Sequence, residues 1–336
     1  EGWRGVALDV HSSQLNQHPA TQAGIIRTPY LDSACAAASV GQRWRPARMS
    51  SLHSELAQWR ANPLREMLAG AVATFALIPE VIAFSFVAGV DPQVGLFASF
   101  VLSIVIAVFG GRPAMITAAA GSVALVAAPL ISAHGLPYLF AAGLLAGIIQ
   151  IMFGVLRLGV LMRFVSSSVR TGFVNALAIL IFAAQLPQLH GATAATWAML
   201  ALGLLVIYGL PRLPLPGVLA IPSPLICIVV LSVLASWLKL DLPTVADLGK
   251  LPDALPQWMG LPSLPWDLET LRIIAMPALA IAMVGLLESM MTARVVDELT
   301  DTPSSKNREC TGLGVANITA SLFGGIAGCG MIGQTV

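Results

Sequence analysis

Long apolar stretches separated by short polar connections dominate the sequence from residue 66 onward. Many have the length of about 20 residues that a helix needs to cross the hydrocarbon core of a bilayer. The pattern predicts nine spans, at 66–88, 94–110, 114–133, 137–156, 171–187, 194–210, 217–238, 271–295 and 311–325, and the start of a tenth near 328. The third is short and interrupted by glycine, so we expect a half-helix there rather than a full crossing.

The two ends depart from this pattern. Residues 1–48 are polar and proline-containing, with neither a helical period nor the residue order of a signal peptide. We hypothesise that Met49 is the natural start, that 1–48 is a non-native or disordered extension, and that 49–63 is a cytoplasmic amphipathic lead-in. A native product whose mass requires residues before Met49 would contradict this. The last segment has only begun at Val336, so we expect the C-terminal part of the fold to be missing.

Composition agrees with a chain that lies mostly in lipid. The sequence is 57% hydrophobic and 10% charged, against about 25% charged residues in an ordinary soluble domain. A net charge of +1 provides no basic surface for nucleic acid. The four cysteines show neither metal-binding nor disulfide spacing, and Cys227 and Cys329 are interpreted as small apolar side chains. The prediction is an all-α polytopic membrane protein without metal or cofactor.

Basic residues indicate the orientation. They precede the first span and occupy the connections after the second, fourth, sixth and eighth spans, whereas the alternate short connections contain no Lys or Arg. The positive-inside rule then places the N-terminus in the cytoplasm. Seven crossings bring the chain outside, so the eighth span runs opposite to the first, as an inverted repeat requires. We expect the first repeat at 64–238, an extracytoplasmic connection at 239–270, and the start of the second repeat at 271–336.

Two lone acids lie in apolar spans, where an ionised carboxylate costs several kcal/mol. Glu80 follows Pro79, which disturbs the helix and frees backbone carbonyls near the acid, and burial favours proton uptake there near neutral pH. Glu288 and Thr292 share one helix face and resemble half of a small-cation or proton site. The alternative interpretations are a protonated structural Glu80, and a Thr292 hydroxyl bonded back to the carbonyl of Glu288.

A glycine-rich break follows each acid at a similar distance, at Gly121-Ser122 and around Gly330. A short extended segment that leads into a helix start exposes backbone N–H groups and a positive dipole end. Two such starts facing each other would bind an anion without a buried Arg or Lys. Glycine could instead serve close helix packing. The sequence contains none of the HExxH, GxSxG or P-loop motifs of enzymes.

Several runs resemble the sulfate permease (SulP) family. They are 157–165 (RLGVLMRFV), 171–182 (TGFVNALAILIF) with Gln185 and Leu186, 285–293 (GLLESMMTA), 307–309 (NRE), 312–317 (GLGVAN) and 323–334 (FGGIAGCGMIGQ). The likeness covers about 62–336. It implies a seven-plus-seven inverted repeat with core and gate domains, and a parent that continues through spans 11–14 into a STAS domain and is a homodimer. It also implies a bacterial inner (plasma) membrane location.

The resemblance also implies roles for residues. The half-helices at spans 3 and 10 would hold the anion between spans 1 and 8, through Gly121 and Ser122 on one side and Gly330, Met331 and Ile332 on the other. Glu288 matches an acid associated with coupling cations, and Thr292 a nearby hydroxyl position. Pro79-Glu80 looks like the pair of bacterial members thought to use protons. Ala124 stands where some members have threonine, so contacts to the substrate are expected to differ.

The favoured function is secondary active transport of a small anion (sulfate, bicarbonate or dicarboxylate) by alternating access, coupled to protons. Sodium-coupled bicarbonate-type symport, or anion exchange, is the alternative. A nucleobase permease of similar architecture is disfavoured by the family-like runs. A membrane-embedded enzyme would need clustered nucleophiles or metal ligands, and a scaffold would not need acids inside its spans.

Overall fold

The computed structural model describes residues 63–159, 167–189, 191–212, 223–240, 249 and 251–335. These residues belong to one compact unit, Pro46–Val336. The interpretations of 1–48 and of 49–62 therefore concern residues outside the described part. The helices and strands are, in chain order, α4 (Pro63–Ala88), α5 (Pro92–Phe109), β1 (Thr117–Ala119), α6 (Gly121–His134), α7 (Leu136–Val155), α8 (Ser167–Gln185), η3 (Leu186–Leu189), α9 (Ala194–Gly209), η4 (Leu210–Arg212), α10 (Ser223–Trp237), α12 (Leu268–Thr300), α13 (Lys306–Leu322), β2 (Gly328–Gly330) and α14 (Ile332–Thr335).

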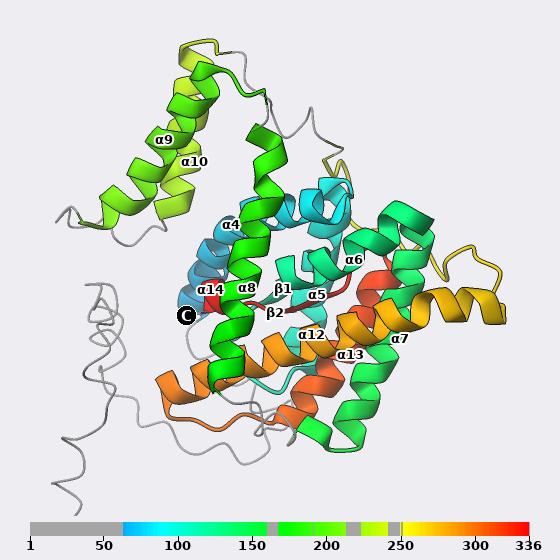
Figure 1. The fold of residues 1–336 in the computed structure, drawn as a ribbon. Helices are drawn as coiled ribbons and strands as arrows, with labels where there is room; N and C mark the ends of the chain where they lie inside the picture. Colours follow the sequence, from blue (N-terminus) through cyan, green and yellow to red (C-terminus); the bar gives the residue numbers. More distant parts are fainter. Residues whose placement is uncertain are drawn as a thin grey trace, which may run out of the picture. The chain divides into compact units, whose positions relative to one another are not determined.

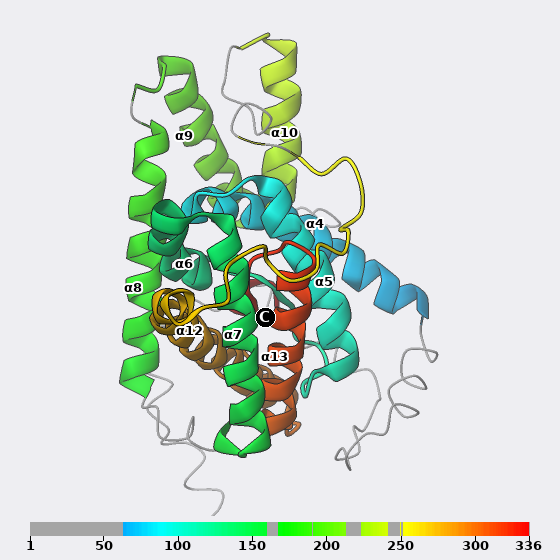
Figure 2. The same ribbon diagram turned by 90° about the vertical axis from the view of Figure 1, so that its right-hand side faces the viewer.

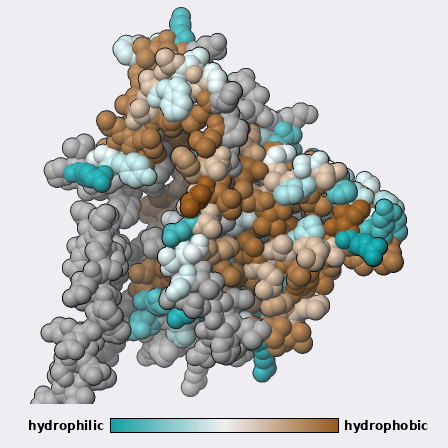
Figure 3. All heavy atoms as spheres, viewed as in Figure 1, coloured by the Kyte–Doolittle hydropathy of each residue, from teal (hydrophilic) through white to brown (hydrophobic). Residues whose placement is uncertain are grey.

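Four of the described helices are long and apolar enough to cross a membrane: Glu66–Ala88, Pro92–Phe109, Leu136–Val155 and Leu268–Thr300. Large hydrophobic side chains are exposed along them, including Phe75, Ile104 and Met152. Figure 3 shows the result on one face, where brown hydrophobic side chains dominate and hydrophilic ones gather toward the edges. Such a surface suits hydrocarbon, in which helices satisfy their own backbone groups.

The third expected span begins later than the sequence indicated. Residues 117–119 form β1, and the helix starts only at Gly121 and has 14 residues. β1 pairs antiparallel with β2, with Thr117 opposite Gly330 and Ala119 opposite Gly328. Alanine-rich text favours helix locally, so the long-range pairing overrides the local preference here. The two short strands lie side by side among the helices in Figure 1.

The outer edge of β1 carries buried backbone groups that no strand satisfies, and two serines of α5 satisfy them. The N–H of Ala119 donates to Oγ of Ser99 at 3.2 Å. Oγ of Ser103 donates to the carbonyl of Thr117 at 3.1 Å. The two serines are one helical turn apart, so both reach the strand from the same face of α5.

α7 and α13 lie side by side in both ribbon views (Figures 1 and 2), and they pack through glycine. A Cβ on Gly147 would lie 2.6 Å from the carbonyl oxygen of Gly314, which no real side chain tolerates. Small residues at a crossing let two backbones approach closely, a common device of membrane helices. This packing holds α13 against β2, where Asn317 of α13 bonds to Gly328.

Candidate functional site

The strand pair leads directly into two helices at one cavity. α6 starts just after β1, and α14 starts just after β2. A cavity of about 160 Å³ is lined from α4, from the β1–α6 and β2–α14 junctions, and from α8 and α12. Its lining residues are Glu80, Phe84, Ala120, Gly121, Ser122, Phe173, Val174, Ile181, Glu288, Met291, Met331, Ile332, Gly333 and Gln334. Since about 10–15 Å³ admits one water, the cavity has room for a small ion with part of its hydration shell.

Both acids singled out from the sequence line this cavity. Glu80 lies in α4 directly after Pro79, which is inside the helix, and its side chain is partly exposed. Glu288 lies in α12 and accepts hydrogen bonds on Oε2 from the hydroxyl of Ser122 and from Sγ of Cys329, the latter at 3.0 Å. The structure therefore brings the first span, the eighth span and the start of α6 to one place.

A side chain at Gly121 would displace two residues of the cavity wall. A Cβ there would lie 2.7 Å from Cε1 of Phe84 and 3.0 Å from Cδ1 of Ile181, both of which line the cavity. The N–H groups in the first turn of α6 have no intrahelical acceptor, and the positive end of the helix dipole lies with them. No Lys or Arg is among the described lining residues. Positive potential at this end of the cavity thus comes from backbone.

Thr292 and Gly330 lie behind the cavity rather than on its wall. The Thr292 hydroxyl lies 3.0 Å from the carbonyl oxygen of Glu288 and 2.9 Å from that of Gly330. Its single proton can serve one of these acceptors at a time. The contact of Thr292 with the carbonyl of Glu288, which the sequence offered as an alternative, is thus present. The same hydroxyl also connects α12 to β2 through the carbonyl of Gly330.

The sequence reasoning missed four residues next to this site. Cys329 is not merely a small apolar side chain, because its thiol contacts the Glu288 carboxylate. Ser289 accepts the N–H of Gly330 at 2.8 Å. Asn317 and Gln150 form a buried amide pair behind β2. The position of Ser289, three residues before Thr292 and so on the same helix face, was an available signal; the others become visible only through the fold.

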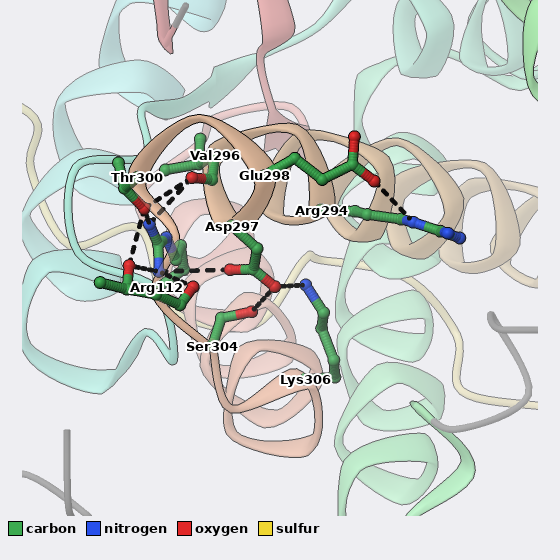
Figure 4. Close-up of polar contacts among 9 residues, drawn as sticks. Arg112, Arg294, Val296, Asp297, Glu298, Thr300, Ser304 and Lys306 are labelled. Atoms are coloured by element: carbon green, nitrogen blue, oxygen red, sulfur yellow. Dashed lines mark hydrogen bonds and ion pairs between the residues drawn. The ribbon is translucent and has the colours of Figure 1, made fainter. Parts of the chain in front are cut away.

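A second polar cluster connects the segment before β1 to the end of α12 (Figure 4). Arg112, whose side chain is 5% exposed, pairs with Asp297 at 3.2 Å. It also donates to the carbonyl oxygens of Thr302 and Val296 and to the hydroxyl groups of Thr300 and Thr302. Desolvation lowers the pKa of Arg112, and Asp297 opposes that shift.

Lys306 completes this cluster by pairing with the other oxygen of Asp297 at 2.7 Å. The sequence offered Arg112 and Lys306 only as markers of membrane orientation. In the structure they join the α5–β1 connection to α12 and α13. The arginine is almost fully desolvated, so losing Asp297 would leave the charge of Arg112 poorly compensated, whereas losing Arg112 would leave Asp297 paired with Lys306.

Comparison with known proteins agrees with this architecture. The model of the sulfate permease family matches residues 64–199 and 192–336. The chain belongs to the sulfate permease family. It is 52% identical over 279 residues to the putative sulfate transporter YbaR of Bacillus subtilis (strain 168), a match that covers 83% of the chain and 57% of the relative. Its identity to the bicarbonate transporter BicA of Picosynechococcus sp. is 27% over 303 residues, covering 81% of the chain and 52% of BicA.

Solved structures show the same fold. The transmembrane domain of a cyanobacterial bicarbonate transporter BicA superposes with a TM-score of 0.68 at 23% identity, covering 82% of this chain and 75% of that one. Murine Solute Carrier 26 family member A9, an anion transporter in the inward-facing state, gives 0.67 at 16% identity, covering 90% and 59%. The chain spans about half the length of the curated relatives it matches. These relatives are transporters rather than enzymes.

Proposed function

We propose that the whole protein is a secondary active transporter of a small anion, working by alternating access across a bacterial inner membrane. The observation that carries the proposal is the cavity in which the α6 helix start, the β2–α14 junction and two carboxyl groups meet. Family membership and the names of its relatives, a putative sulfate transporter and a bicarbonate transporter, support an inorganic anion. Dicarboxylates remain a further substrate class to test.

The anion would bind against the first-turn N–H groups of α6 and the Ser122 hydroxyl, with Met331 and Ile332 contributing from the opposite junction. Gly330, expected from the sequence to join them, lies behind the wall and would hold that junction in place. Two carboxyl groups on the same cavity wall oppose this, because like charges at short range in a poorly solvated space repel strongly. An anion in the cavity therefore favours the uncharged form of Glu80 or Glu288. By linkage, a protonated carboxyl group favours anion binding to the same extent. This reciprocity is the physical basis for proton coupling.

Sodium is the second candidate for the coupled ion. The hydroxyl oxygen of Thr292 lies between the backbone carbonyl oxygens of Glu288 and Gly330, where α12 meets β2. Oxygen ligands of this kind suit a hard cation. In this version Glu288 and Thr292 hold the cation, and Glu80 has no part in coupling.

The inverted repeat is part of the same proposal. Each expected repeat supplies one acid-bearing helix (α4, α12) and one strand that leads into a helix start (β1–α6, β2–α14). α6 and α14 would be the half-helices of spans 3 and 10, with the N-terminus in the cytoplasm and the parent a homodimer. The antiparallel pairing of β1 with β2 is what two inverted copies of one element would produce.

Uptake of labelled sulfate, bicarbonate and a dicarboxylate into liposomes containing the full-length protein tests the proposal. A pH gradient, acid outside, should drive accumulation of one of these anions, whereas a sodium gradient alone should not. Glu80→Gln should abolish the response to the pH gradient while exchange of labelled for unlabelled anion continues. If this variant keeps full proton coupling, the role of Glu80 is wrong. Uptake driven only by sodium would favour the second candidate.

A further inference from the structure

The outer edge of β2 also carries buried backbone groups with no strand beside them. The N–H of Met331 donates to the carbonyl of Ile116 at 2.8 Å, so residues 331 and 116 form a hydrogen-bonded pair. In an antiparallel ladder such pairs alternate with non-bonded pairs. Cys329 therefore exchanges bonds with Ala118 of β1, and the polar groups of Gly328 and Gly330 point away from β1.

Side chains of two helices take the place of the missing strand. The N–H and C=O of Gly330 bond to Ser289 and Thr292 of α12. The N–H and C=O of Gly328 both bond to one side chain, Asn317 of α13. Oδ1 of Asn317 accepts the Gly328 N–H at 2.8 Å, and Nδ2 donates to the Gly328 carbonyl at 3.2 Å. One amide thus contacts both backbone groups of one strand residue, as a neighbouring strand would.

Gln150 of α7 fixes the orientation of that amide. Nδ2 of Asn317 gives its other proton to Oε1 of Gln150 at 2.8 Å, and Nε2 of Gln150 lies 3.4 Å from the carbonyl of Ala282 in α12. Both side chains are 0% exposed. The amide of Asn317 therefore has both protons and its oxygen engaged. A flipped amide would place NH₂ against N–H and oxygen against carbonyl.

We propose that Asn317, oriented by Gln150, is a positioning residue that holds β2 so that Met331 and Ile332, which follow the strand, stay on the cavity wall. Removing the amide leaves the Gly328 N–H and C=O buried without their hydrogen-bond partner. β2 must then detach or shift, and the β2–α14 side of the cavity moves with it. The effect on anion affinity rests on the proposed transport function, whereas the effect on β2 does not.

The reactivity of Cys329 measures the position of β2 directly. It is the middle residue of the strand and is buried, as are Cys227 and Cys310. Membranes containing the full-length protein are treated with N-ethylmaleimide, and the labelled fraction of each cysteine is followed by peptide mass spectrometry. Asn317→Leu, of similar volume but without polar groups, should speed labelling of Cys329 about ten-fold or more. Cys227 and Cys310 should label as slowly as in the unsubstituted protein.

Ser321 provides the matched control. It lies one turn further along α13, is 2% exposed, and has no hydrogen-bond partner for its hydroxyl within the described part of the chain. Ser321→Ala should leave all three labelling rates unchanged. Asn317→Asp, which keeps the shape and the acceptor for the Gly328 N–H but lacks the NH₂ donors, should give an intermediate rate. It also serves as the second variant if Asn317→Leu does not accumulate.

Transport supplies the second arm. Displaced binding groups should raise the KM for the transported anion about ten-fold in Asn317→Leu, with a much smaller change in the maximal rate. Unchanged Cys329 protection would overturn the proposal, as would equal exposure of all three cysteines, which indicates general unfolding. If Cys329 labels faster while the KM stays unchanged, Asn317 holds the strand but does not position the anion site, and the proposal is wrong on that point. If no anion is transported even by the unsubstituted protein, the proposed function fails, and the labelling result stands separately.

Discussion

At the scale of single residues, the Glu309 carboxyl group shows most clearly how burial raises the free energy of ionisation. It lies in the first turn of α13, ahead of the apolar stretch 311–325, and is completely buried. Oε2 accepts the N–H of Gly111 at 2.7 Å, and Oε1 has no partner among the described residues. Burial raises the pKa of Glu309 to about 7, against the lowering effects of the N–H groups of Gly111 and Arg112 and the charges of Lys306 and Arg308.

This shift predicts a pH-dependent stability. In the unfolded chain Glu309 ionises near its ordinary pKa of 4.5, whereas in the folded protein it keeps its proton to about pH 7. Its contribution to stability is therefore fully present below pH 4.5 and is lost as the pH rises to 7, by about 3 kcal/mol at most. Thermal unfolding in detergent at pH 5 to 8 should show the fall, and Glu309→Gln should flatten it. An unchanged slope in this variant would contradict the assignment.

The Ser122 hydroxyl joins the start of α6 to the Glu288 carboxylate. Removing a hydrogen bond to a charged group in a poorly solvated site costs about 1.5–3 kcal/mol, so Ser122→Ala should slow anion uptake roughly ten-fold or more. Ser122→Thr keeps the hydroxyl and should retain most activity. Ser132→Ala is the control on the same helix, because its hydroxyl is exposed and bonds only the carbonyl of Pro129. Normal uptake by Ser122→Ala would rule out the link.

How much of the site was predictable depends on which residues are considered. Glu80 and Glu288 stand out in the sequence because an ionised carboxyl group within an apolar span costs free energy whichever way that side of the helix faces. The glycine-rich breaks at Gly121 and near Gly330 indicated the two helix starts, although the span expected at 114–133 began seven residues before α6 does. Cys329, Asn317 and Gln150 could not be predicted, because their roles depend on the strand β2: Cys329 is its middle residue, and the two amides pack beside it from α13 and α7.

At the scale of elements, the long helices follow the hydropathy pattern to within a few residues at most ends. The strands β1 (TAA) and β2 (GCG) do not, because three small residues are too few to show alternation and Thr117 is their only β-branched side chain. Their pairing depends on contacts between segments far apart in sequence. Polar side chains such as Ser99 and Ser289 bond to the outer backbone groups of these strands. They are the residues in the sequence that depend on the sheet, although the strands themselves have little β propensity.

The glycine crossing of α7 and α13 gives a prediction at this scale. Gly147→Ala places a Cβ 2.6 Å from the Gly314 carbonyl oxygen, so the helices must separate. Overpacking of this kind costs about 1–3 kcal/mol, and the variant should unfold at lower temperature in detergent. Gly70→Ala in α4 is the control, because its Cβ meets nothing within 4 Å; it should be neutral or slightly stabilising. Equal behaviour of the two variants would show that the crossing tolerates a methyl group.

At the scale of the whole molecule, family and fold follow from long motifs and superposition, whereas orientation rests on charge distribution alone. The basic connections include the Arg112, Asp297 and Lys306 cluster, where the α5–β1 segment meets α12 and α13. If that side faces the cytoplasm, Glu298 near the end of α12 lies inside. Ala194 at the start of α9 then lies outside. Both residues are exposed, so one reagent can test both.

Single cysteines at these two positions decide the orientation. Cys227, Cys310 and Cys329 are buried, so a Cys35→Ser background should be silent toward a membrane-impermeant maleimide. In intact cells Ala194→Cys should label at once, and Glu298→Cys only after the membrane is permeabilised. Loss of the exposed Arg294–Glu298 pair should cost little, since surface pairs contribute about 0–1 kcal/mol. The reverse labelling order would invert the topology. Labelling of both in intact cells would mean that the chain does not separate the two sides as the basic residues predict.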